Sequence, residues 1–188
     1  MKLATAQKHP VTNTPAISST ATLRANARRK IEEGAVTATY SANREQVLKM
    51  LNDSLATEIV CMLRYKRHYF MATGVHAESV ATEFLEHATQ ETEHADAIAK
   101  RIVQLGGEPD FSPDTLTKRS HAEYVPGKTL VEMIKEDLVA ERIAIDSYKE
   151  MIEVIGDDDP TTRRMIEWIL SVEEEHADDL AGLLDAGR

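Results

Sequence analysis

Four long stretches of the chain contain neither glycine nor proline, and this constrains its fold more than any other feature. They cover residues 35–73, 75–105, 128–155 and 161–181. Apart from the start of the first stretch, they are rich in Ala, Leu, Glu, Lys, Met and Ile, which favour helices. We predict helices over about 42–73, 76–105, 129–155 and 160–184. The sequence therefore predicts an all-α fold.

The ends of these helices carry recognisable signals. Ser41 is the predicted N-cap of the first helix and Gly74 its C-terminal stop, while Asp159 followed by Pro160 is a strong start for the fourth. Residues 1–40 are expected to form a basic N-terminal arm, flexible over positions 1–20 and with a short helix over positions 21–33. Residues 41–186 are expected to form the helical domain.

The lengths of the connections predict the topology. Short connections make the first and second helices one antiparallel hairpin, and the third and fourth another. The remaining connection, from Gly106 to Gly127, has 22 residues. In extended form it reaches further than the roughly 45 Å length of a 30-residue helix. We expect a four-helix bundle of two hairpins joined by a long crossover.

A glutamate interrupts the apolar seam of every predicted helix. The seams follow alternating spacings of four and three, the pattern by which bundle helices bury one face. Two of the glutamates are followed three residues later by a histidine on the same helix face. All four glutamates are nearly equally far along the chain from the tight turn of their own hairpin, so they should meet near mid-bundle. The six residues are Glu58, Glu91, His94, Glu141, Glu173 and His176.

Four buried carboxylates need positive charge, since each unpaired ion would cost several kcal/mol. The seams offer no Lys or Arg at that level. Two divalent cations would supply the charge, and carboxylate plus imidazole ligands suit iron or manganese. A single Glu-x-x-His pattern is more often a solvated helix face. Two copies, two lone glutamates and matched heights together predict a di-metal site.

Other side chains near these residues have weaker signals. Tyr65, seven residues after Glu58, is a candidate catalytic residue that hydrogen-bonds a ligand or is oxidised, with plain core packing as the alternative. His87 is interpreted as a core histidine or as part of the outer shell or iron path. Cys61 is expected to be a buried small hydrophobe, and Trp168 to serve packing. Four histidines match no ligand pattern and are expected at the surface: His9, His68, His76 and His121.

Charge and composition exclude several classes of protein. A net charge of -10 argues against a simple nucleic-acid binder, although residues 1–30 hold six basic residues and no acid. One cysteine excludes an intrachain disulfide framework and a four-cysteine zinc site. The absence of a long apolar run or signal-peptide pattern predicts a cytoplasmic protein without a membrane partner.

At these motifs the sequence resembles the bacterioferritin branch of the ferritin-like superfamily, over roughly residues 45–184. The stretches that carry the likeness are LNDSLATEIVCMLRY, ETEHADAIAKRI, EDLVAERIAI and EEEHADDL. The resemblance implies a ferritin-like bundle in which the six residues are ferroxidase ligands, with Glu91 and Glu173 bridging the metals. It also implies that Tyr65 matches the family's redox-active tyrosine.

Two departures from that pattern change the expectation. Bacterioferritins place a haem-ligating methionine where this chain has Thr92, so no haem is expected. They also have a fifth short helix, whereas this sequence ends too soon after His176 to form one. The combination resembles the Dps-like ferritins, which form 12-subunit cages. Starvation-type Dps proteins place their ligands across a dimer interface and would not need this intrachain set.

The expected function is that of an iron-storage and detoxification ferroxidase. Two iron ions per subunit, with manganese possible, would bind the site; Fe(II) would be oxidised by O2 or H2O2 and stored as Fe(III) in a homo-oligomer, a dodecamer by resemblance. One alternative is a ferritin-like peroxidase or manganese catalase that stores no iron. Another is a Dps-type protein that protects DNA by binding it through the basic arm.

Overall fold

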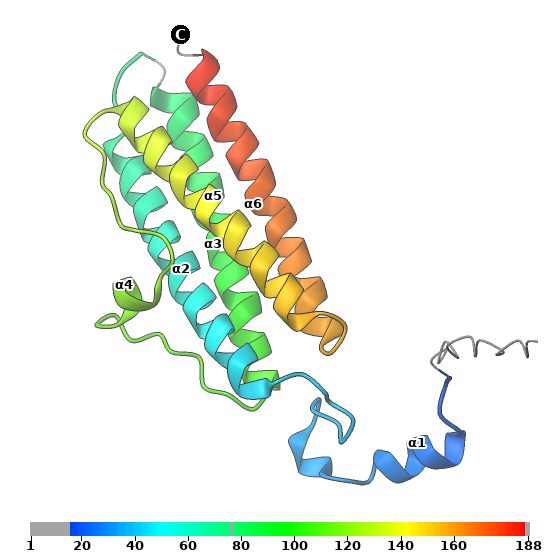
Figure 1. Cartoon of the computed structure of the whole chain (residues 1–188). Coiled ribbons are helices and arrows are strands. Elements are labelled where there is room, and N and C mark those ends of the chain that lie inside the picture. The colour runs from blue at the N-terminus through cyan, green and yellow to red at the C-terminus, as the bar shows by residue number, and fades with distance from the viewer. Residues whose placement is uncertain (1–15, 76, 187–188) are drawn as a thin grey trace, which may run out of the picture.

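A computed structural model describes residues 16–75 and 77–186 of the protein, and its body is a four-helix bundle. Each end of the long helices lies within two residues of its predicted position. The first pair packs as one hairpin and the second pair as another (Figure 1). The predicted all-α bundle of two hairpins with a long crossover is confirmed. The helices are α2 (Arg44–Met71), α3 (Ala77–Gln104), α5 (Leu130–Ile155) and α6 (Pro160–Ala186).

The start of α2 differs from the prediction. Asn43, not Ser41, caps the helix, and its side chain accepts a hydrogen bond from the Gln46 amide at 3.2 Å. The Ser41 hydroxyl instead donates to the Asp158 carboxylate at 2.8 Å. Ser41 therefore ties the chain before α2 to the turn before α6, a contact between distant segments that sequence spacing does not reveal.

The starts of α5 and α6 have ordinary capping chemistry. Thr129 and Glu132 form a capping box at the first turn of α5. Asp159 accepts a hydrogen bond from the Thr162 amide at 2.9 Å, and α6 begins at Pro160 as predicted. The Asp159–Pro160 signal therefore predicted the start of α6 correctly.

The crossover between α3 and α5 runs back along α2 and contains one short helix, α4 (Leu116–Arg119), which was not predicted (Figure 1). Leu116 packs with Val60 of α2. The Arg119 guanidinium donates to the Asn52 carbonyl oxygen at 2.6 Å. A helix of one turn has little stability of its own, so it depends on these contacts.

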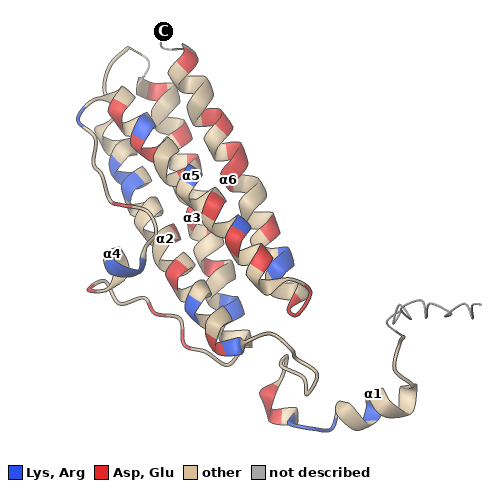
Figure 2. Cartoon of the chain, in the orientation of Figure 1, with Lys and Arg blue, Asp and Glu red and all other residues tan. Residues whose placement is uncertain are grey.

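The N-terminal arm is less helical than predicted. Its helix α1 (Thr20–Asn26) is short, and a 3-10 turn (Ile31–Glu33) follows; neither contains a buried residue. Lys30 has a positive φ of 49°, which separates the two elements, and its amine pairs with Glu33 at 3.2 Å. Figure 2 shows basic residues in the arm followed directly by acidic ones. The basic residues at positions 2 and 8 lie outside the described residues.

Two hydrophobic clusters fill the bundle on either side of a polar layer. On α2 the first cluster ends at Leu55 and the second begins at Tyr65, with Glu58 between them. On α3 the same division falls between Ala88 and Ala95. The polar layer thus lies at mid-bundle, enclosed by apolar packing at both ends. Among the residues that the structure describes, no helix combines the length and apolar character that membrane crossing requires.

A second group of buried charge, which we call the Asp137 network, links α2 to α5 and the crossover. The Asp137 carboxylate accepts from Arg64 Nε at 2.8 Å and lies 2.7 Å from His68 Nδ1. Arg64 also donates to the Glu123 carbonyl at 2.7 Å, and His68 Nε2 lies 3.0 Å from the Pro126 carbonyl. Each of these side chains therefore has its own partners inside the protein.

The outcome for the histidines expected at the surface is mixed. His68 is fully buried, so that prediction is wrong; its partner Asp137 comes from another hairpin, which no pattern around His68 indicates. His121 is exposed as predicted, and its ring bonds Ser147 at 2.9 Å. His9 and His76 lie outside the described residues.

Candidate metal centre

The structure brings all six predicted site residues together in the polar layer, and each is only 1% exposed. They lie at one height because they are nearly equally far along the chain from their turns. They point inward because each lies on the apolar face of its helix. We call them the Glu/His cluster: Glu58, Glu91, His94, Glu141, Glu173 and His176.

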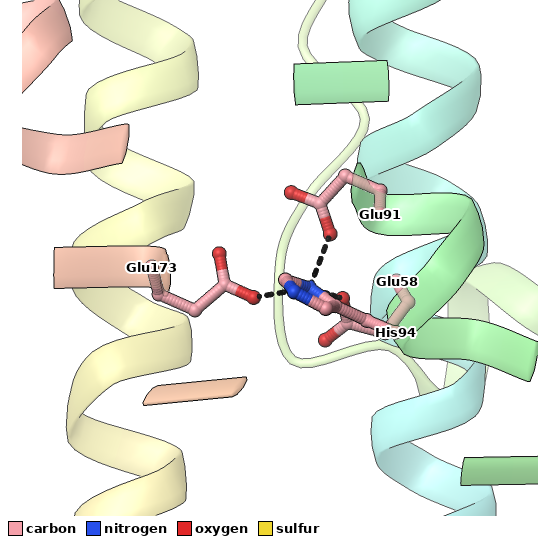
Figure 3. Close-up of side chains that lie close together, drawn as sticks. All are labelled: Glu58, Glu91, His94 and Glu173. Atoms are coloured by element: carbon pink, nitrogen blue, oxygen red, sulfur yellow. Dashed lines mark hydrogen bonds and ion pairs between the residues drawn. The ribbon is translucent and has the colours of Figure 1, made fainter. Parts of the chain in front are cut away.

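One half of the cluster surrounds His94 (Figure 3). Its Nδ1 lies 3.2 Å from Glu58 Oε2, 3.0 Å from Glu173 Oε1 and 3.8 Å from Glu91 Oε2. Glu58 comes from α2, Glu91 and His94 from α3, and Glu173 from α6. One imidazole nitrogen thus faces carboxylates from three helices.

The other half surrounds His176. Its Nδ1 lies 3.3 Å from Glu173 Oε2 and 3.8 Å from both Glu91 Oε1 and Glu141 Oε2. Its other nitrogen, Nε2, bonds Gln90 Oε1 at 2.8 Å. Because an amide oxygen only accepts, this bond keeps a proton on Nε2, and in a neutral ring it turns the Nδ1 lone pair toward the carboxylates. Gln90 was not predicted as a site residue.

Glu91 and Glu173 belong to both halves. Each directs one carboxylate oxygen toward His94 and the other toward His176. The donor atoms consequently form two overlapping groups, each with all its atoms within 4.8 Å of one another. The groups are Glu58, Glu91, His94 and Glu173, and Glu91, Glu141, Glu173 and His176. Two cations side by side, bridged by Glu91 and Glu173, would fit this arrangement.

Several ligand atoms in the cluster are unsatisfied. Glu91 Oε1, both carboxylate oxygens of Glu173, and His176 Nδ1 are buried without a hydrogen-bond partner among the described residues. Buried polar atoms are nearly always paired, because leaving one unpaired costs about 1–3 kcal/mol. These atoms point at each other, so what they lack is a shared partner at their centre.

The two central glutamates favour the neutral form. Burial, together with the charges of Glu173, Glu58 and Glu141, raises the pKa of Glu91 well above its ordinary value. Burial and the charges of Glu58 and Glu141 raise the pKa of Glu173 to about 8. The raised pKa values favour the protonated form of both carboxyl groups.

The two outer glutamates are ionised. Burial would raise the pKa of Glu58, but hydrogen bonds with Glu91 and His94 outweigh it and lower the pKa below its ordinary value. For Glu141, burial is likewise outweighed by the neighbouring His176 and Glu173 side chains, and its pKa is about 2. Negative charge thus lies at the two ends of the cluster.

Both histidines favour the charged form in the metal-free cluster. Burial would lower the pKa of His94, but the Glu173 and Glu58 carboxylates beside its Nδ1 raise it to about 10. The pKa of His176 is raised to about 9 by Glu141 and Glu173 against the opposing effect of burial. Two anionic glutamates and two imidazolium rings cancel, so protons neutralise the metal-free cluster.

Two tyrosines complete the cluster symmetrically. The Tyr65 hydroxyl donates to Glu141, and the Tyr148 hydroxyl donates to Glu58, so each phenol reaches the lone glutamate of the opposite hairpin. Burial raises the pKa of both phenols well above the ordinary value, which keeps them as donors. Tyr148 was not predicted as a site residue. Its spacing of seven from Glu141, which matches that of Tyr65 from Glu58, is the signal that identifies it.

His87 lies beside the cluster and is 1% exposed. Its ring stacks on His176 with centroids 4.0 Å apart, and its Nδ1 lies 3.3 Å from the Tyr65 hydroxyl. Burial and the charge of His176 lower the pKa of His87 to about 4, so its ring is neutral. His87 therefore contacts two residues of the site without belonging to either ligand group.

Cys61 and Trp168 both pack against other residues of the bundle. Cys61 is a buried residue packed with Ala122 and Ala140, as expected, and burial raises its pKa well above the ordinary value. Trp168 is 43% exposed, with its ring edge-on to His94 at 5.2 Å between centroids. Its contact with His94 is in keeping with the packing role expected of it.

The fold and the cluster define a class: four-helix bundles in which a lone glutamate from each of two helices meets a Glu-x-x-His pair from each of the other two. A sequence family described as ferritin-like domain matches residues 48–188. The chain belongs to this family.

Individual relatives agree with that assignment. The bacterioferritin of Mycobacterium avium is 30% identical over 141 residues, which cover 74% of this chain and 84% of the relative. A dodecameric thioferritin of Bacteroides fragilis, a bacterioferritin-related protein, has a TM-score of 0.75 and 30% identity, covering 78% of this chain and 89% of that one. The Dps of Thermosynechococcus elongatus shares the fold, with a TM-score of 0.71, 22% identity and coverage of 74% and 90%. The predicted resemblance to bacterioferritin and Dps-like proteins is confirmed.

Proposed function

We propose that the Glu/His cluster is a di-iron ferroxidase centre, and that the protein stores the oxidised iron in a hollow homo-oligomer. The observation that carries the proposal is the cluster's unsatisfied core, in which Glu91 and Glu173 each direct one oxygen toward His94 and the other toward His176. Membership of the ferritin-like family supports iron as the cargo.

Charge supports two divalent cations as the missing partners. Four ionised glutamates carry a charge of -4, which two divalent cations balance without protons on the ligands. The metal-free cluster reaches the same neutrality with protons on two glutamates and two histidines. Cation binding would therefore exchange protons for metal at constant net charge, which avoids a buried excess charge in either state.

The residues have separate tasks in this proposal. Glu58 with His94 would hold one Fe(II), and Glu141 with His176 the other, while Glu91 and Glu173 bridge them. The substrate iron supplies the electrons, and O2 or H2O2 accepts them. Tyr65 and Tyr148 hold the outer glutamates by hydrogen bonds. Gln90 orients His176 through its Nε2.

The apolar clusters above and below the site have a task as well. They exclude water from the polar layer, which strengthens electrostatic interactions within it. The Trp168 ring limits solvent at the His94 side.

Storage requires a cage, and the dodecameric relative from Bacteroides fragilis supports an assembly of that kind. A dodecamer would have twelve times the 21.0 kDa mass of the single chain. Native mass spectrometry of the iron-loaded protein would measure the assembly. A dimer, with only twice the mass of the chain, that retains no mineral would favour the non-storing peroxidase or manganese catalase.

The oxidation step is tested by stopped-flow absorbance after mixing metal-free protein with Fe(II) and O2, or with Fe(II) and H2O2 without air. Glu91→Gln should abolish rapid oxidation, because one bridging carboxylate is lost while shape is retained. Glu93→Gln, at an exposed position of α3, is the matched control and should oxidise iron like the original chain. Unchanged oxidation by a folded Glu91→Gln protein would exclude the cluster as the site. A parallel reaction with Mn(II) compares the two metals.

A further inference from the structure

A second group of metal-binding side chains lies directly outside the Glu/His cluster. Glu83 and His87 of α3 and Asp179 of α6 place one donor atom each within 4.8 Å of one another. The Glu83 and Asp179 side chains are 32% and 48% exposed, whereas that of His87 is 2% exposed. The group therefore extends from solvent to the edge of the buried cluster.

The orientation of His87 distinguishes this group from an ordinary acidic surface. Its Nδ1 lies 3.3 Å from the Tyr65 hydroxyl, which leaves Nε2 as the free nitrogen. Nε2 faces Glu83 Oε1 at 3.5 Å and Asp179 Oδ2 at 3.8 Å. Both distances exceed the 2.7–3.2 Å range of N–H···O hydrogen bonds. One nitrogen of a buried histidine thus points between two carboxylates at distances longer than ordinary hydrogen bonds.

This spacing suits a cation better than a hydrogen bond. Donor atoms around one divalent cation lie about 2.0–2.5 Å from it, and so are separated from each other by up to roughly 5 Å. The set of one imidazole and two carboxylates is the same donor chemistry as in each half of the Glu/His cluster. Two carboxylates and a neutral imidazole would also balance one divalent charge.

We propose that Glu83, His87 and Asp179 form a third divalent-cation site, at which Fe(II) binds before it reaches the Glu/His cluster. The His87 ring stacks on His176, with centroids 4.0 Å apart, so a cation held here would be next to a residue of the cluster. With only three protein donors, two of them partly exposed, the site would keep bound water and release its cation readily. The delivery role rests on the proposed ferroxidase function; the binding of a cation does not.

Zinc is a suitable probe, because it is redox-inert and accepts imidazole and carboxylate ligands. Crystals of the full-length protein soaked in Zn(II) should show, by anomalous scattering, two ions in the Glu/His cluster and a third bound to His87 Nε2. The double variant Glu83→Gln/Asp179→Asn should lose only the third ion. The control Glu175→Gln/Asp178→Asn removes two exposed carboxylates from α6 and should retain all three.

The outcomes separate this inference from the proposed function. Zinc in the Glu/His cluster but not beside His87 would overturn the third site and leave the ferroxidase centre in place. Zinc beside His87 with an empty cluster would support the third site and count against the ferroxidase centre.

Delivery is tested by the dependence of the initial oxidation rate on Fe(II) concentration. Glu83→Gln/Asp179→Asn should slow oxidation several-fold at low Fe(II) and approach the original rate at saturating Fe(II), because capture is impaired and the oxidising site is intact. The Glu175→Gln/Asp178→Asn control should follow the original curve. Equal rates for the first variant and the original chain at every concentration would overturn the delivery role.

Discussion

The Asp137 network and the Glu/His cluster are both buried in the same bundle, and both join α2 to α5, yet they satisfy their charges differently. In the network, Asp137 is held by Arg64 and His68, and these two also bond backbone carbonyls. In the Glu/His cluster, four ligand atoms have no partner among the described residues. Buried charge alone therefore does not mark a functional site; buried charge without partners does.

The difference arises from the source of positive charge. The network contains an arginine, whose guanidinium stays protonated in proteins and offers donors in a fixed plane. The Glu/His cluster contains only groups that gain or lose protons, and in the metal-free protein it depends on protons for neutrality. The Asp137 network contains its own fixed positive charge, whereas the Glu/His cluster can exchange its protons for cations.

The largest expected effect concerns this exchange. Binding of two divalent cations near neutral pH should release about four protons, one each from Glu91, Glu173, His94 and His176. Each released proton makes binding stronger by about 1.4 kcal/mol per pH unit. Calorimetric titration of Zn(II) in buffers of different ionisation enthalpy measures the proton count. A count near zero would mean that the cluster is already ionised and would remove the contrast with the Asp137 network.

Cation binding should strengthen as the pH rises, whereas the free energy of unfolding of the metal-free protein should fall. His94 and His176 have folded pKa values of about 10 and 9, above the 6.5 of an unperturbed histidine. Their stabilising contribution is complete below pH 6.5 and is lost as the pH rises toward 10. The free energy of unfolding without metal should therefore fall over this range, and denaturant titrations in the presence of chelator measure it.

The next largest effect is on the free energy of unfolding. Asp137→Ala leaves the Arg64 guanidinium buried without its carboxylate and should destabilise the metal-free protein by about 3–5 kcal/mol. Glu91→Gln should change the free energy of unfolding by less than about 1 kcal/mol, since the raised pKa of Glu91 favours its neutral form there. Urea denaturation compares the two, with the exposed Asp146→Ala of α5 as control. Equal losses from Asp137→Ala and Glu91→Gln would contradict the comparison.

A smaller effect is expected from the residue that orients His176. Gln90→Leu removes the hydrogen bond to Nε2 and should weaken cation binding about 10- to 100-fold, as loss of outer-shell partners usually does. The loss should concern one of the two cations, because Gln90 contacts only the His176 half. Zn(II) titration followed by calorimetry separates the two binding steps. Thr89→Val, at an exposed position of the same helix, should bind both cations unchanged.

The smallest expected effect comes from Tyr148, whose hydrogen bond to Glu58 was not predicted. Tyr148→Phe removes one hydrogen bond to Glu58 and should cost about 1 kcal/mol of stability. Tyr65→Phe should cost a similar amount through Glu141. Their effects on iron oxidation should differ if Tyr65 is redox-active, since only then does its loss exceed that of a hydrogen bond. Equal oxidation rates in both variants would assign Tyr65 a structural role.

Most of the bundle and all six cluster residues were predictable because they follow helix periodicity. A spacing of three or four determines which face a residue occupies, and distance from a turn determines its height. Gln90 lies outside the Glu-x-x-His pattern and acts by reaching His176 on another helix. Its role depends on side-chain direction and helix rotation, which periodicity does not specify.

The sequence by itself determined four amphipathic helices, their hairpin pairing and the common height of the carboxylates, because these follow from local propensity and counting. Only the tertiary structure decided which buried charged side chains have partners within the protein. Arg64 and His68 find Asp137 on the other hairpin, and α4 forms where Leu116 meets α2. Such partners lie far apart along the chain, so packing alone brings them together. The same packing leaves three carboxylate oxygens of Glu91 and Glu173 buried without a hydrogen-bond partner among the described residues.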